Sequence, residues 1–136
     1  PVDLHWLGRA HTSGDIFIHL PQDRLLFTGD VAQSGGVPYM LDGYMQDWGE
    51  TDARLLELDA ERFVSGHGPV GERPALIEAH EFISALLGGV TSAHAAGQNE
   101  TTAVAAVTSA MRDRFGGWRG FDRVEDGVAH TYRQMA

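Results

Sequence analysis

Three side chains of metal-ligating types lie far apart along the chain, each where a strand-like run of residues ends. They are His11 in GRAHTSGD, Asp30 in LLFTGD and His67 in FVSGHGP. Glycine flanks each of them, and a residue without a Cβ lets backbone and side chains approach a shared point closely. Two neutral imidazoles and one carboxylate are donors that a borderline divalent cation such as zinc prefers. The sequence therefore predicts a metal site, provided that folding brings the three together.

The elements that must position these residues can be read from the hydrophobic pattern. Residues 2–6 alternate apolar and polar side chains, which predicts a half-buried strand leading to His11. Residues 16–20 also alternate, PQDR forms a turn, and residues 25–28 return, which predicts a hairpin that ends just before Asp30. Residues 31–49 show no steady period and are predicted to be a loop running into a helix over 51–58. A short strand at 63–64 then precedes His67.

The chain is predicted to be helical from Pro69 to its end. Pro74 suits a first helical turn, and Gly97 is a plausible stop signal at the end of that helix. Thr101 or Thr102 is expected to cap a second helix that runs to about residue 111, where FGGWRG follows. A last short helix is expected over residues 122–134.

The order of these motifs resembles the metallo-β-lactamase superfamily of metal-dependent hydrolases, from about residue 2 to residue 87. The resemblance implies that His11 binds one metal ion, that Asp30 bridges two ions and is the catalytic residue, and that His67 binds the second ion. Up to two zinc ions are implied in the complete site. The implied reaction is hydrolysis of an ester, thioester, lactam or phosphoester by zinc-activated water.

One departure from the family is as informative as the match. The HxHxDH segment, which supplies three more ligands in the family, is absent from this sequence. We therefore expect one domain over residues 1–136 of the α/β (α+β) class. It is half of an αββα sandwich, with a small mixed sheet covered by helices and a helical C-terminal third. We expect weak or absent zinc binding, little activity alone, and either a homodimer or a complementary N-terminal half as partner.

Structural explanations compete with the functional ones at several positions. Asp30 follows glycine, where aspartate commonly closes a turn, although the motif favours the ligand role. Asp15 would either orient an imidazole or close a turn. Five further histidines are expected to be ordinary surface or core residues: His5, His19, His80, His94 and His130.

Aromatic and methionine residues gather between the second and third motifs. Tyr39, Tyr44 and Trp48, with Met40 and Met45, are candidates for a substrate-contacting wall, because loops beside metal sites often determine specificity. The alternative is that these residues only anchor the loop to the following helix. A small-molecule substrate is the partner that the first interpretation implies.

Composition excludes several classes of function. The formal net charge of −9 with scattered basic residues argues against nucleic acid as a partner. No apolar run is long enough for a membrane span and no leader segment is visible, while the absence of cysteine fits a cytoplasmic location. Three hypotheses remain: a metallohydrolase half domain, a non-catalytic dimeric binding or assembly module, and a truncated fragment of a full enzyme.

Overall fold

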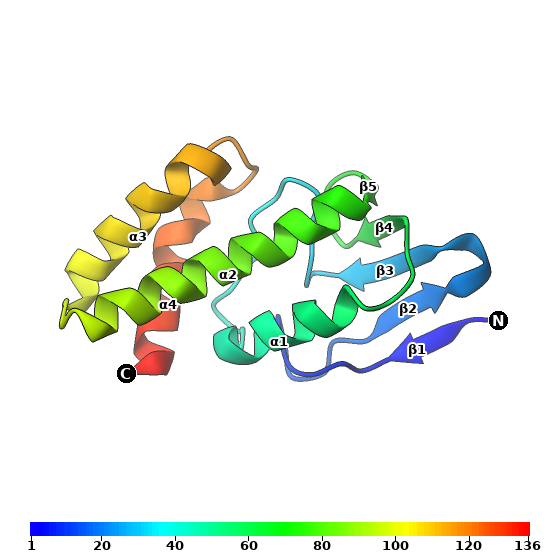
Figure 1. Cartoon of the computed structure of the whole chain (residues 1–136), viewed down its shortest axis with the longest axis horizontal. Helices are drawn as coiled ribbons and strands as arrows, with labels where there is room; N and C mark the ends of the chain where they lie inside the picture. Colours follow the sequence, from blue (N-terminus) through cyan, green and yellow to red (C-terminus); the bar gives the residue numbers. More distant parts are fainter.

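The computed structural model describes all of residues 1–136. Figure 1 shows a sheet at one end of the molecule, α3 and α4 at the other end, and the long helix α2 running between them. The five-stranded sheet has the order β1-β2-β3-β4-β5. Its strands are β1 (Asp3–His5), β2 (Phe17–Leu20), β3 (Leu25–Gly29), β4 (Arg62–Ser65) and β5 (Gly71–Glu72).

Four α-helices accompany the sheet: α1 (Met45–Leu55), α2 (Arg73–Ala95), α3 (Glu100–Phe115) and α4 (Val124–Met135). Helix α2 begins with proline in its first turn, and Gly97 follows its end with a φ of 70°. The Asn99 side chain caps α3 by accepting a hydrogen bond from the Thr102 backbone N–H at 2.9 Å. None of the helices is both long and apolar enough to cross a lipid bilayer.

Strand direction determines which loops meet. Strands β1 and β2 are antiparallel, β2 and β3 are antiparallel, and β3 and β4 are parallel. The C-terminal ends of β1, β3 and β4 therefore lie at the same edge of the sheet. Each of these ends is followed by one of the three motif loops, so the topology directs all three loops toward one place.

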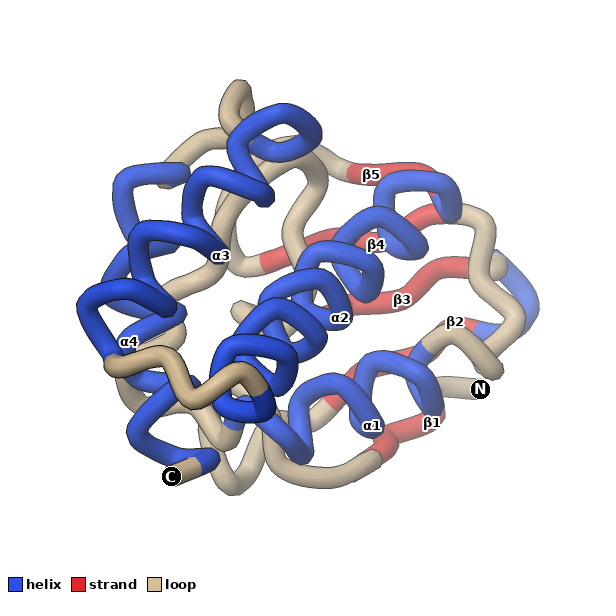
Figure 2. Tube along the Cα trace, turned by 60° about the vertical axis from the view of Figure 1, so that its left-hand side comes forward, coloured by secondary structure: helices blue, strands red, loops and turns tan.

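The two faces of the sheet differ in how far they are covered. Helices α1 and α2 lie across one face (Figure 2), where Phe17, Leu26 and Phe63 are fully buried in the main core. On the other face, Leu4 is paired with Ile18, and these two side chains are 69% and 37% exposed. This uncovered face continues across the sheet, because Ile18 is paired with Phe27 and Phe27 with Val64. We call this row (Leu4, Ile18, Phe27 and Val64) the open sheet face.

The mixed sheet, the helical layer and the helical C-terminal third confirm the fold class predicted from the sequence. Three details of the prediction are wrong. Helix α1 begins at Met45 rather than at residue 51, the short strand β5 was not predicted, and Asn99 rather than a threonine caps α3.

Candidate metal centre

The side chains of His11, Asp30 and His67 lie together at the edge of the sheet. Nε2 of His67 is 3.3 Å from Oδ1 of Asp30, and Nε2 of His11 is 4.0 Å from Oδ2 of the same carboxylate. Each imidazole thus faces a different oxygen of Asp30. In this arrangement one carboxylate could bind two neighbouring cations, one through each oxygen.

Local packing holds the three loops in place. The His11 loop is attached to α1, because Ala10 accepts a hydrogen bond from Tyr44 N–H at 2.9 Å and the Thr51 hydroxyl donates to the Arg9 carbonyl at 2.8 Å. The His67 loop is attached to the end of β3, because Gly66 N–H donates to the Gly29 carbonyl at 2.7 Å. Ligand-bearing loops that are fixed in this way lose little further entropy on binding a cation.

Gly66 is fitted to the carboxylate of Asp30. A Cβ atom at position 66 would overlap with Oδ1 of Asp30. Two imidazoles and a carboxylate, with a glycine making room for the carboxylate, fit a zinc or similar divalent cation. The fit is incomplete, because with Asp30 shared each of two ions would receive two protein ligands, where stable sites use three or four.

A cavity of about 290 Å³ opens beside the three side chains. The imidazoles and Asp30 form one side of it, and residues from the loop after β3 and from the segment after α3 form the rest. Its full lining is His11, Asp30, Gln33, Tyr39, His67, Arg119, Gly120 and Arg123. Gln33, Arg119 and Arg123 were not predicted from the sequence, since nothing in the local pattern of residues 116–123 indicates a contact with a loop near residue 34.

The three aromatic residues predicted as a substrate wall are separated in the structure. Tyr39 lines the cavity, is 47% exposed, and lies edge-on to the His11 ring with 6.4 Å between centroids. Tyr44 lies beneath the guanidinium of Arg9 and lines a different cavity. Trp48 is fully buried, with its indole N–H donating to the Val31 carbonyl at 3.2 Å. Trp48 packs edge-on against His11 at 6.0 Å, so it supports the imidazole and does not face the cavity.

Asp15 and three of the other histidines have structural partners. Asp15 accepts a hydrogen bond from Thr12 N–H at 2.8 Å, which is the turn-closing alternative. His19, His94 and His130 each donate from Nε2 to a backbone carbonyl, those of Asp59, Tyr132 and Gly43 respectively. These contacts fit the expectation that such histidines are ordinary parts of the fold.

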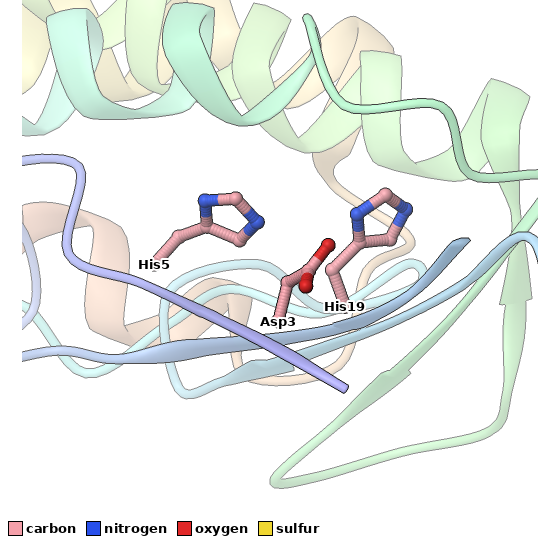
Figure 3. Close-up of side chains that lie close together, drawn as sticks. All are labelled: Asp3, His5 and His19. Carbon is pink, nitrogen blue, oxygen red and sulfur yellow. The ribbon is translucent and has the colours of Figure 1, made fainter. Parts of the chain in front are cut away.

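A second group of ligand-type side chains lies on the helix-facing side of β1 and β2 (Figure 3). Asp3, His5 and His19 each offer one ligand atom, and these atoms lie within 4.8 Å of one another. Nε2 of His5 is buried and has no hydrogen-bond partner. Any measurement of zinc binding by this chain must therefore separate this group from the site at the sheet edge.

One buried carboxyl group lies outside both groups. Asp52, on α1, is 2% exposed, and neither of its side-chain oxygens has a hydrogen-bond partner. Burial raises the pKa of the Asp52 carboxyl well above its usual range, since desolvation penalises the charged form.

The structure thus combines a mixed sheet that has helices on one face with three ligand-type side chains on the loops at one edge. A family model described as the metallo-beta-lactamase superfamily matches residues 5–67, the stretch that ends at the last predicted ligand. Over this stretch the chain is similar to the metallo-β-lactamase superfamily.

Individual proteins are similar to the same part of the chain. A type 2 metallo-beta-lactamase of Bacillus cereus is 26% identical over 87 residues, covering 60% of this chain and 34% of that protein. The solved metallo-beta-lactamase of Pontibacter korlensis superposes with a TM-score of 0.56 at 24% identity, covering 61% of this chain and 41% of that one. The mono-zinc form of FIM-1 from Pseudomonas aeruginosa has a TM-score of 0.57 at 19% identity, covering 62% and 39%. These structures show the fold, and the chain spans about a third of the length of the curated relative.

Proposed function

We propose that the chain supplies one part of the active site of a metal-dependent hydrolase. The observation that carries this proposal is the placement of Asp30 between two imidazoles, 3.3 Å from His67 and 4.0 Å from His11, beside a cavity. In this proposal His11 would hold one zinc ion, His67 would hold a second, and Asp30 would contribute an oxygen to each. Bound zinc would lower the pKa of a coordinated water toward neutrality and polarise the substrate oxygen.

The chain's own residues have defined tasks in this scheme. Asp30 would hold both cations and neutralise part of their charge. Trp48 holds the plane of His11 by edge-on packing, and Gly66 leaves room for the bridging carboxylate. The substrate enters the cavity beside Tyr39, and its scissile bond is an ester, thioester, lactam or phosphoester.

The remaining ligands must come from elsewhere, because the sequence lacks HxHxDH. We propose that a complementary half with that segment covers the open sheet face and completes the coordination of both ions. The exposure of Leu4 and Ile18 supports this occupant, since sheets of a sandwich pack face to face through apolar side chains. The share of the curated relative that this chain spans, 34%, leaves ample length for such a half.

The experiment compares the purified chain with an equimolar mixture of the chain and a separately expressed N-terminal half from a family member. We expect the mixture to hold zinc and hydrolyse generic lactam and thioester substrates, and the chain alone to do neither well. D30N should abolish turnover in the mixture, while H5A, in the second ligand group, should not. Tight stoichiometric zinc and turnover by the chain alone would contradict the need for a complementary half.

A second candidate function is a non-catalytic dimeric assembly module. The same open sheet face favours it, because two copies could cover each other's Leu4 and Ile18. Sedimentation of the chain distinguishes the two: a dimer that persists when the complementary half is added supports the module, and dissociation into a heterodimer supports the hydrolase.

A further inference from the structure

The cavity beside the candidate ligands carries two arginines that the metal site does not use. Arg119 and Arg123 line it on the side contributed by the segment between α3 and α4. This segment lies outside residues 5–67, the stretch matched by the family model. The cationic side of the cavity is therefore a feature of this chain's own C-terminal part.

Arg119 is held in place by backbone and side-chain contacts together. Its backbone N–H donates to the Gly35 carbonyl at 3.1 Å, and its carbonyl accepts from Val37 N–H at 2.8 Å. Its Nη1 donates to the Ser34 carbonyl at 3.0 Å. A Cβ atom at Gly68 would overlap with the guanidinium, so this group lies directly against the residue that follows His67. The arginine is thus fixed next to the candidate metal ligands.

The residue before Arg119 fixes the segment to the core. Trp118 stacks on Phe82 with 5.4 Å between ring centroids and meets Phe115 edge-on at 4.8 Å. Aromatic contacts of this kind hold a turn rigidly. Preorganisation of this sort reduces the entropy that a ligand must overcome when it binds to Arg119.

Gln33 and Arg123 add further hydrogen-bond donors. Gln33 is 5% exposed, lines the cavity, and its amide makes no hydrogen bond with the rest of the chain. An anion in the cavity can accept from the amide N–H groups of Gln33. Nη1 of Arg123 donates to the Val37 carbonyl at 3.1 Å, which leaves its other N–H groups free.

Half of the chain's ten arginines form no ion pair, and Arg119 and Arg123 are the two of these that line the cavity beside the candidate ligands. In a chain with a net charge of −9, Arg9, Arg24, Arg54, Arg114 and Arg133 each form an ion pair with a carboxylate. Arg119 and Arg123 form none, and their hydrogen bonds within the chain go to neutral carbonyl groups. Asp30 lines the same cavity but forms no ion pair with either arginine. Two guanidinium groups that share a cavity and form no ion pair are a candidate site for an anion, because guanidinium matches carboxylate and phosphate oxygens in pairs.

We propose that Gln33, Arg119 and Arg123 form an anion subsite that binds a carboxylate or phosphate group of the substrate. This inference rests on the proposed function, since the subsite would hold one end of the substrate while its scissile bond lies over His11, Asp30 and His67. The substrate class is then a hydrolysable compound with an anionic group beside the bond to be broken. Neutral substrates of equal size would lack this anchor.

The test uses the chain after zinc has been removed with EDTA and the EDTA has been dialysed away, so that it does not depend on the metal. Inorganic phosphate and, separately, acetate are titrated while NMR follows the Nε signals of the arginines and the backbone amides of Gly68 and Gly120. We expect saturable shifts at these positions with at least one of the two anions, and the tighter anion identifies the preferred group. Absence of saturable shifts with both anions would overturn the proposal.

Variants locate the binding. R123Q should weaken anion binding at least about fivefold, and R119K should weaken it less than R119Q if the charge matters in addition to the fold. R62Q, at an exposed arginine of β4, is the matched control and should bind normally. Equal binding by wild type and the R119Q/R123Q double variant would contradict the subsite. H67A should retain anion binding while it loses zinc, so failure of the metal site and failure of the anion subsite are seen separately.

Discussion

Gly66 lies so close to Asp30 that a Cβ atom at position 66 would overlap with Oδ1 of the carboxylate. The same Oδ1 atom is 3.3 Å from Nε2 of His67. A glycine that is not itself a ligand therefore determines where the shared carboxylate lies. The first prediction follows from this contact.

G66A should displace Asp30 and weaken zinc binding at least about tenfold, which is about 1.4 kcal/mol. It should also destabilise the fold by about 1–3 kcal/mol, the usual cost of overpacking. Chelator competition in the mixture with the complementary half measures the first effect, and urea unfolding of the chain measures the second. G14A is the control, because nothing lies within 4 Å of a Cβ at that position. Unchanged zinc affinity in G66A would show that the position of the Asp30 carboxylate does not determine how tightly zinc binds.

Asp52 should make the stability of the chain depend on pH. Burial raises the pKa of this carboxyl in the folded state, whereas the unfolded chain ionises it near about 3.9. The stabilising contribution of the neutral form is therefore fully present below about pH 3.9. It is lost as the pH rises toward the folded-state pKa, at up to about 1.4 kcal/mol per pH unit.

D52N removes the titrating group and should flatten this part of the pH profile of the free energy of unfolding. Urea unfolding at several pH values from about 4 upward measures the slope. D42N, at an exposed position, is the matched control and should keep the wild-type slope. A D52N profile that runs parallel to that of the wild type would show that Asp52 is not responsible.

The open sheet face should drive self-association of the isolated chain. Ile18 is 37% exposed on this face, and Ile77 is 39% exposed on helix α2. We expect I18E to weaken self-association at least about tenfold and I77E to leave it unchanged, because only Ile18 belongs to a continuous apolar row. Sedimentation velocity across a concentration series measures both. Equal effects of the two substitutions would mean that the contact is not made through the sheet.

The three candidate ligands and the strands before them could be predicted because each signal is local. Apolar and polar side chains alternate before His11 and before Asp30, which indicates strands, and glycine-containing loops mark the ends of these strands. Their convergence follows from the shared direction of β1, β3 and β4. The start of α1 could not be predicted. Met45 and Trp48 are buried in this helix, but they follow a loop of equally apolar residues, so no change in the period of the hydrophobic pattern marks the boundary.

The cationic side of the cavity was beyond prediction for a different reason. Arg119 contacts Ser34 across 85 positions of the chain, and the pairing of these segments depends on how Trp118 packs between α2 and α3. Trp48 illustrates the opposite error. Its residue type suggested a substrate contact, but the first turns of α1 bury it completely.

The most direct test of the central claim is a zinc titration of the chain observed through the imidazole signals of its histidines by NMR. We expect the signals of His11 and His67 to shift together, D30N to abolish their joint shift, and the signals of His94 and His130 to stay unchanged. Zinc shifts confined to His5 and His19, or independent shifts of His11 and His67 that survive D30N, would contradict a metal centre built around Asp30.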